Sequence, residues 1–539
     1  MSRHPLHSAL TRRGAMALLA LLAAGVSASG CLGGGGGGGA DDGTLRLAQT
    51  AEPTTLDPAQ VQDGPTIEFM MHVFEGLVQW SPENKLVPAL AEKWEISPDG
   101  RTYTFTIRQG AKFHNGREVT AEDFAYSISR TLADKTSSVA EVYLNDILGA
   151  KAYREGKTQK LEGVEVVDPR TLKITIDAPK GYFLAKLTYP TAYAVCKEAV
   201  ENTSTMTEQE AIGTGPFRLA EYRRGDRMIL EAFPEYWDGA PKLARIERRI
   251  LLDAGTRHDA FEAGDLDIAD VSMAMYRADK DNPELADKLK LFPRPSIYYI
   301  ALNQQAYAPF KDRRVRQAFA HAVDRNAIVQ TVHEGVPQVA AGIVPTGVPG
   351  HDPDFRGLEY DPARAKQLLS EAGYPNGRGL PPLTLYFRAQ VEDIRNTAQV
   401  VAEQLKNNLG LEVKLAEEEW TTFLAKRNRG EMPVYFLRWA ADYLDPQNFL
   451  SLMLHSGSKE NTLGYSNPEF DRLCDQADVM QDAEKRLATY RRAEEIVVSD
   501  APWIPIHFQK DVELWNPRLR GVEDSAMGHL PHKRTHFAD

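Results

Sequence analysis

The residues best suited to bind a charged ligand lie in one segment towards the C-terminus, residues 435–446. An apolar stretch there predicts a short strand that runs into Trp439 and two alanines. Asp442 follows at the strand's end, where it could hold a cation, because a buried ammonium needs a compensating carboxylate. The alternative is a turn in which Asp442 caps the next element and Trp439 fills the core.

No pattern for catalysis accompanies this segment. The sequence has no G-x-S-x-G elbow, no H-E-x-x-H, no phosphate loop and no G-x-G-x-x-G. His333 is followed by Pro337 where a second zinc histidine would have to stand. Cys196 and Cys474 lack a local catalytic signature. We therefore expect neither an enzyme nor a cofactor.

Three histidines near the C-terminus are a further candidate for chemistry: His529, His532 and His536. Their spacing could in principle hold a metal ion. A short polar tail explains the same residues, and we predict that interpretation rather than a metal site.

The fold must bring these side chains together, and the sequence predicts strands and helices that alternate along the chain. Residues 102–108 and 172–176 alternate apolar and polar side chains, which predicts two half-buried strands. Thr120 is a good helix N-cap, and Asp123 would stand at the third helical position. Further apolar periodicity predicts helices at residues 315–322, 398–405 and 487–497. The expected class is mixed α/β.

Length, charge and cysteine content limit the number of domains and the kinds of partner that we expect. The chain has 539 residues, too many for one hydrophobic core, so we expect two or three domains. The formal net charge of −12 argues against nucleic acid as the partner. Besides Cys31, only Cys196 and Cys474 are present, and they could pair in an oxidising compartment or stay unpaired and buried.

The N-terminus predicts export and anchoring. Basic residues precede an apolar run at 15–26, which is shorter than the about 20 residues that span a bilayer. Small residues at 28–30 then precede Cys31, as in a bacterial lipoprotein whose cysteine is acylated. We expect residues 1–30 to be the signal peptide and residues 31–43 a glycine-rich tether. Lipidated Cys31 would anchor the protein to a bacterial membrane on its extracytoplasmic side. The alternative is an ordinary secretory signal with an incidental cysteine.

Motifs along nearly the whole mature chain resemble those of bacterial oligopeptide-binding proteins. The segment at 439–446 is similar to the W-x-A-D-Y-x-x-P segment that grips the peptide's free amino terminus in that family. The other matching motifs, in chain order, are F-E-G-L (74–77), P-A-L-A-E-K-W (88–94), F-H-N-G (113–116), V-T-A-E-D-F (119–124), G-T-G-P-F (213–217), P-E-Y-W (234–237), F-E-A-G-D-L-D (261–267) and A-V-D-R (322–325).

This resemblance, to the solute-binding proteins of ABC importers (family 5), implies a fold and a role. The fold would be the two-lobed periplasmic-binding-protein type (class II, cluster C) with a third accessory domain. One lobe would comprise residues 44–74, 213–296 and 508–539, the other residues 297–507, and the accessory domain residues 75–212. The protein would close around a peptide by a hinge motion and deliver it, as a monomer, to an ABC permease and ATPase complex.

The resemblance also implies the binding residues. Asp442 matches the aspartate that pairs with the α-ammonium of the peptide. Trp420 and Arg427 lie in a run similar to the family's E-W-x-T-F-L-x-x-R; Trp420 would line a side-chain pocket, and Arg427 would be a candidate partner for a peptide carboxylate. The alternatives are core packing for Trp420 and a solvated helix face for Arg427. The remaining expected ligand-binding residues are Arg438, Trp439, Ala440 and Tyr443.

Two departures from the family leave the ligand open. Phe436 stands where the closest oligopeptide binders carry an arginine that can meet a peptide C-terminus, and Ala440 stands where a cysteine can occur. The sequence therefore does not fix the length of the peptide. A non-peptide ligand, such as a nickel chelate, an oligosaccharide, an opine or another amine, remains an alternative. A different class is a surface-anchored interaction or chaperone-like protein without transport coupling.

Overall fold

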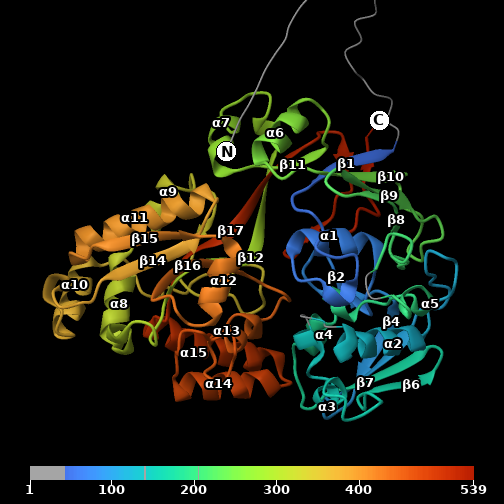
Figure 1. Cartoon of the computed structure of the whole chain (residues 1–539), viewed down its shortest axis with the longest axis horizontal. Coiled ribbons are helices and arrows are strands. Elements are labelled where there is room, and N and C mark those ends of the chain that lie inside the picture. Colours follow the sequence, from blue (N-terminus) through green and yellow to red (C-terminus); the bar gives the residue numbers. More distant parts are fainter. Residues whose placement is uncertain (1–42, 137, 139–140, 204–205, 539) are drawn as a thin grey trace, which may run out of the picture. The chain divides into compact units, whose positions relative to one another are not determined.

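The computed structural model describes residues 43–136, 138, 141–203 and 206–538. The expected signal peptide and Cys31 lie outside these residues. Among the described residues, the strands form one large sheet and four smaller ones (Figure 1). The large sheet has the order β15 (Val413–Glu418), β14 (Leu383–Arg388), β16 (Val434–Ala440), β12 (Leu289–Leu302), β17 (Trp503–Trp515), β11 (Ile268–Asp270), β1 (Thr44–Gln49), β10 (Arg245–Ile250), β9 (Arg227–Ala232) and β8 (Phe217–Arg223), with β13 (Gln338–Val339) paired to β17.

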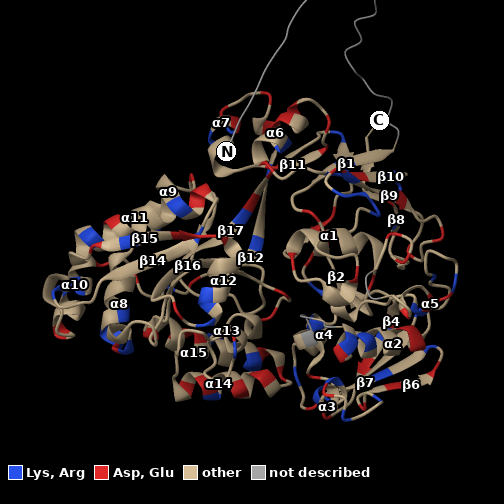
Figure 2. Ribbon diagram, viewed as in Figure 1, with Lys and Arg blue, Asp and Glu red and all other residues tan. Residues whose placement is uncertain are grey.

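The long strands β12 and β17 join the two halves of this sheet. They run antiparallel from the pair Leu289–Leu514 to the pair Ala301–Trp503, with a register shift between Pro293 and Ile297. On one side β12 pairs with β16, and on the other β17 pairs with β11. Figure 2 shows that β12 and β17 carry charged residues, whereas β14 and β16 are mostly uncharged.

Both faces of β16 are covered, which explains its nearly continuous apolar sequence. Val434 and Phe436 point into a core shared with the helices α8 (Arg313–Ala322) and α11 (Glu392–Leu409). Tyr435 and Leu437 point to the opposite face, into a core shared with α14 (Pro468–Val479) and α15 (Ala483–Asp500). This alternation follows from the two-residue period of a strand. Beyond Leu437 burial decreases: Arg438 is exposed, and Trp439 and Ala440 are half-buried.

A separate sheet of four antiparallel strands, in the order β4 (Ala91–Ile96), β5 (Thr102–Ile107), β7 (Thr171–Thr175) and β6 (Val164–Asp168), packs against α2 (Ala121–Leu132). The predicted strands at 102–108 and 172–176 are confirmed as β5 and β7. The predicted cap is confirmed as well, because the backbone N–H of Thr120 donates to the Asp123 carboxylate at 2.8 Å.

The remaining two-stranded sheets pair β2 (Val78–Trp80) with β3 (Leu86–Pro88), β18 (Leu519–Arg520) with β21 (His536–Phe537), and β19 (Asp524–Ser525) with β20 (Gly528–His529). The other helices are α1 (Gly64–Val73), α3 (Ala150–Arg154), α4 (Phe183–Lys186), α5 (Lys197–Val200), α6 (Ala254–Glu262), α7 (Met273–Asp279), α8 (Arg313–Ala322), α9 (Arg325–Thr331), α10 (Pro362–Glu371), α11 (Glu392–Leu409), α12 (Trp420–Asn428), α13 (Ser451–Leu454), α14 (Pro468–Val479) and α15 (Ala483–Asp500). The predicted helices are confirmed as α8, α11 and α15.

The described residues also answer two smaller questions. Cys196 and Cys474 are both free and buried, so they form no disulfide in this structure. No helix in the described part of the chain is long and apolar enough to cross a membrane.

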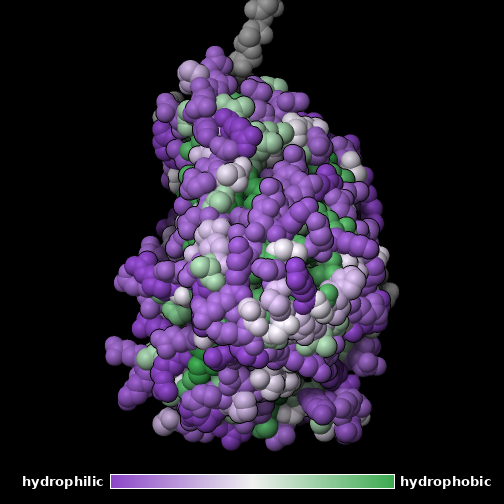
Figure 3. Space-filling model, turned by 90° about the vertical axis from the view of Figure 1, so that its left-hand side faces the viewer, coloured by the Kyte–Doolittle hydropathy of each residue, from purple (hydrophilic) through white to green (hydrophobic). Residues whose placement is uncertain are grey.

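The face shown in Figure 3 is mostly hydrophilic, with small separate hydrophobic areas. The predicted division into two lobes and an accessory domain stays a prediction.

Candidate functional site

Asp442 lies just beyond the end of β16, in a turn held by Asn448. The Asp442 backbone N–H donates to Asn448 Oδ1 at 3.3 Å, and Asn448 Nδ2 donates to Asp442 Oδ2 at 3.3 Å. Trp439 Nε1 donates to the same asparagine, at 3.0 Å to its carbonyl oxygen and 3.1 Å to its Oδ1. Asn448 therefore fixes both the tryptophan and the aspartate.

Asp442 does not cap the next element, contrary to the alternative considered from sequence. That role belongs to Asp445, whose carboxylate accepts from the backbone N–H of Gln447 at 2.9 Å at the start of the short 3₁₀ helix Pro446–Asn448. The side chain of Asp442 caps no helix and instead accepts a hydrogen bond from Asn448.

Among the residues that the structure describes, the carboxylate of Asp442 has no cationic partner. None of the ion pairs among the described residues involves it, and no cation contributes to its titration. Burial raises its pKa to about 6, while hydrogen bonds from Asn448 and Tyr143 oppose that rise. A desolvated carboxylate without a cation is unfavourable, so this position favours a ligand that brings a positive charge.

Tyr143, which sequence analysis missed, contributes the second hydrogen bond to Asp442. Its hydroxyl donates to the carboxylate, and its ring stacks on Tyr189 with centroids 3.8 Å apart. Tyr143 belongs to the 3₁₀ helix Glu141–Leu144 and has no motif of its own, so only the fold brings it to Asp442. Nearby, Tyr443 is buried, stacks on Tyr182 at 6.2 Å and donates a hydrogen bond to Gln447.

Trp420 begins α12, where the Glu419 side chain caps the helix by accepting from the N–H of Thr421 at 2.9 Å. The Trp420 ring is half-buried and stacks on Phe423 at 5.9 Å, and the guanidinium of Arg388 lies 4.9 Å from its centre. Trp420 thus packs against the core and keeps an exposed part. Its role in lining a side-chain pocket stays a prediction.

Arg427 is 7 % exposed, so the alternative of a solvated helix face is wrong. Its guanidinium pairs with Glu460, at 3.0 Å to the carboxylate and 3.2 Å to the carbonyl oxygen. Glu460 therefore already pairs with the Arg427 guanidinium, which the sequence predicted to bind a peptide carboxylate. Binding of a peptide carboxylate by Arg427 stays a prediction.

Arg438 and Ala440 lie on the same side of β16 as Phe436 by strand alternation. Arg438 Nη1 donates to Gln509 Oε1 at 3.0 Å, and its guanidinium also hydrogen-bonds to the Tyr298 hydroxyl. Phe436 is buried and contacts the Tyr298 ring at 5.9 Å. Phe436 is therefore part of an aromatic floor.

The C-terminal histidines are not a polar tail, and that prediction is wrong for two of them. His529 is enclosed by the carboxylates of Glu513 at 2.8 Å and Asp524 at 3.0 Å, which raise its pKa to about 10 against the effect of burial. His532 is buried and its Nδ1 lies 3.0 Å from Thr535 Oγ1. His529 therefore acts as a buried cation between acids.

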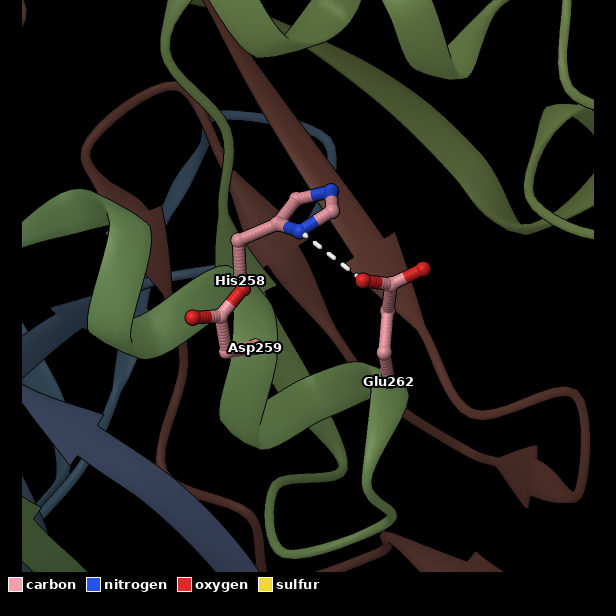
Figure 4. A group of neighbouring side chains, drawn as sticks. All are labelled: His258, Asp259 and Glu262. Carbon is pink, nitrogen blue, oxygen red and sulfur yellow. Dashed lines mark ion pairs between the residues drawn. The ribbon is translucent and has the colours of Figure 1, made fainter.

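One other cluster has the composition of a metal site: His258, Asp259 and Glu262 on α6 (Figure 4). The imidazole of His258 is already placed between two carboxylates, with Nδ1 at 3.5 Å from Glu262 and Nε2 at 2.9 Å from Asp279. Contacts with these two carboxylates engage both ring nitrogens of His258, so the cluster needs no metal.

Comparison with known proteins adds a family context. Residues 85–461 match the family model described as bacterial extracellular solute-binding proteins, family 5, middle region. The chain is 33 % identical to the dipeptide-binding protein DppE of Bacillus subtilis, with 89 % of this chain and 90 % of that protein covered. It is 31 % identical to the periplasmic oligopeptide-binding protein OppA of Escherichia coli, with 95 % and 96 % covered. Among solved structures, the Escherichia coli murein tripeptide-binding protein MppA matches with a TM-score of 0.78 at 30 % identity, over 92 % of this chain and 98 % of that chain.

Proposed function

This chain belongs to the bacterial extracellular solute-binding proteins of family 5, and on that premise we propose that it captures peptides by binding their α-ammonium at Asp442. The family's fold is two-lobed and mixed α/β, and the relatives are substrate-binding transport proteins rather than enzymes. The relatives named above bind dipeptides, oligopeptides and a murein tripeptide, which supports peptides as the ligand class.

The observation that carries the proposal is the uncompensated carboxylate of Asp442. A peptide's α-ammonium would supply the missing cation. It would bind the Asp442 carboxylate in the orientation that the hydrogen bonds from Asn448 and Tyr143 fix. Main-chain hydrogen bonds to an extended peptide do not depend on its side chains, so one site can serve many sequences. Trp439 and Ala440 would contact the first residues of the peptide, with the buried Tyr443 supporting the turn behind them, and water would fill the space around varied side chains.

Calorimetric titration with short peptides tests this function. We expect tight binding of peptides with a free amino terminus and much weaker binding of the same peptides after N-acetylation, because acetylation removes the cation. Equal affinity for both forms would contradict the proposal. Native mass spectrometry of the purified protein provides an independent measurement, since a co-purified sugar or metal chelate would also contradict it.

Binding should weaken in acid. The Asp442 carboxyl has a pKa of about 6 in the free protein, and a bound ammonium stabilises only the ionised form. Affinity is therefore full above pH 7 and is lost as the pH falls through 6, by about tenfold at pH 5. Titrations at pH 7.5 and pH 5 measure this change, and circular dichroism at both values controls for unfolding. A flat profile would show that another group holds the ligand.

We further propose that lipidated Cys31 anchors the protein outside the cytoplasm, near the ABC permease that receives the peptide. Cys31 lies outside the described residues, and the proposal rests on the sequence around it. The glycine run would span roughly 15 Å as a flexible coil, enough for the body to reorient at the membrane.

Replacing this cysteine separates anchoring from binding. We expect Cys31→Ser to move the protein from the membrane fraction to the soluble fraction and to reduce uptake of labelled peptide by cells. The affinity of the purified protein for peptide should not change. Membrane retention of the Cys31→Ser protein would refute the lipid anchor.

A further inference from the structure

A cavity of about 130 Å³ lies where β12, β16 and β17 meet the first turn of α11. Its floor is aromatic: Tyr298 stacks on His507 at 4.5 Å and contacts Phe436 at 5.9 Å. A single buried water needs only roughly 10–15 Å³ of accessible space, so this cavity can hold a side chain of several heavy atoms. His507 is 3 % exposed, and its Nδ1 finds no hydrogen-bond partner among the described residues.

Two opposite charges line this cavity without pairing. Asp393 lies at the start of α11 and Lys510 lies on β17, and neither takes part in an ion pair within 4.0 Å among the described residues. Burial raises the pKa of Asp393, with a smaller contribution from the neighbouring charge of Glu392. A half-buried carboxylate such as that of Asp393 normally finds a partner, and the nearby Lys510 ammonium forms no ion pair among the described residues either, so the arrangement favours a ligand that carries both signs.

Arg438 adds a second cation at the edge of the cavity. Among the described residues its guanidinium forms no ion pair and hydrogen-bonds to the neutral groups of Gln509 and Tyr298, both of which line the cavity. Arg438 and Lys510 therefore offer two cations to one carboxylate. The imidazoles of His333 and His507 add no positive charge, because burial lowers both of their pKa values.

We propose that this cavity selects the last residue of the peptide: its carboxylate lies between Arg438 and Lys510, and its side chain, a lysine or arginine, reaches Asp393 over the aromatic floor. The proposal rests on the proposed function, because Asp442 fixes the other end of the peptide. An aromatic face also attracts a cationic side chain, which adds to the attraction of Asp393.

The strand geometry sets an approximate length for such a peptide. Arg438 and Asp442 are four residues apart along β16 and the turn that follows, so their Cα atoms lie at most about 13 Å apart. An extended peptide rises about 3.3 Å per residue, so a chain of about three to five residues would place its amino terminus at Asp442 and its carboxylate near Arg438. Shorter peptides would leave one of the two charged ends unpaired.

Calorimetry with tetrapeptides tests the selection. We expect Ala-Ala-Ala-Lys to bind about five- to tenfold more tightly than Ala-Ala-Ala-Leu, and to lose about as much affinity when its carboxylate is amidated. Asp393→Asn should abolish the preference for lysine, and Lys510→Met should reduce the effect of amidation. The matched controls are Glu403→Gln, an exposed acid on the same helix α11, and Lys414→Met, an exposed lysine on β15. Neither control should change the ratio of affinities for the lysine and leucine peptides, or the ratio for the free and amidated peptides.

The outcomes separate this proposal from the proposed function. If tetrapeptides bind through their free amino terminus but lysine and leucine are equivalent at the last position, the selection by Asp393 is wrong and the proposed function stands. If Asp393→Asn binds both peptides as the unmodified protein does, the selection is likewise wrong. If no peptide of two to eight residues binds, both proposals are wrong.

Discussion

Asp442→Ala is expected to abolish peptide binding and to leave the protein folded. The bound α-ammonium would be desolvated without its carboxylate, which costs about 3–5 kcal/mol, so affinity should fall by more than about a hundredfold. Stability should not fall, because Asp442 makes no ion pair and only two side-chain hydrogen bonds in the free protein. Removal of an uncompensated carboxylate is neutral or slightly stabilising. Calorimetry measures the affinity, and thermal unfolding measures the stability.

Two controls make this result specific. Asp354→Ala removes an exposed aspartate from the loop before α10 and should leave binding unchanged. In a combined test, N-acetylation of the peptide should weaken binding to the unmodified protein but have little further effect on Asp442→Ala, since both changes remove the same ion pair. If Asp442→Ala binds peptide normally, the ammonium site lies elsewhere.

Local patterns predicted much of the scaffold. The alternation at 102–108, the cap at Thr120 and the periodicity of α8, α11 and α15 are properties of neighbouring residues, and the structure contains each of them. The local pattern made Asp442 only a candidate, because it follows a strand with small residues beside it; the resemblance to oligopeptide-binding proteins is what favoured ligand binding over a cap.

Long-range partners could not be predicted from such patterns. Tyr143 reaches Asp442 from a distant part of the chain, and Glu460 engages Arg427 from a loop beyond α13. The prediction that His529 lies in a polar tail was wrong for the same reason, because Glu513 and Asp524 surround it only when β17 and β19 have formed. Charge and burial at these positions are consequences of tertiary structure, so sequence spacing alone misjudges them.

The ion pair that supports the ammonium site should be as important for stability as Asp442 is for binding. Arg486 of α15 donates from both terminal nitrogens to the Asp445 carboxylate at 2.8 Å, and both residues are 6 % exposed. Asp445 in turn caps the 3₁₀ helix that ends at Asn448, the residue that holds Asp442 and Trp439. Stability and site geometry therefore depend on one buried pair.

Arg486→Met is expected to lower the apparent free energy of unfolding by about 3–5 kcal/mol, because it leaves Asp445 buried without its cation. Peptide affinity should also fall, since Asn448 loses the capped turn that positions it. Denaturant titration measures the first effect, and calorimetry at a temperature where the variant is folded measures the second. Arg364→Met is the matched control: Arg364 pairs at 3.9 Å with Glu371 on the surface, and its loss should cost at most about 1 kcal/mol.

The double variant Arg486→Met/Asp445→Asn distinguishes a buried charge from lost packing. Asparagine keeps the oxygen that caps the 3₁₀ helix but carries no charge, so most of the lost stability should return. Peptide affinity should recover with it, because Asn448 regains its turn. If the double variant is less stable than Arg486→Met, the packing of the Arg486 side chain against Tyr490, rather than its charge, stabilises this part of the fold.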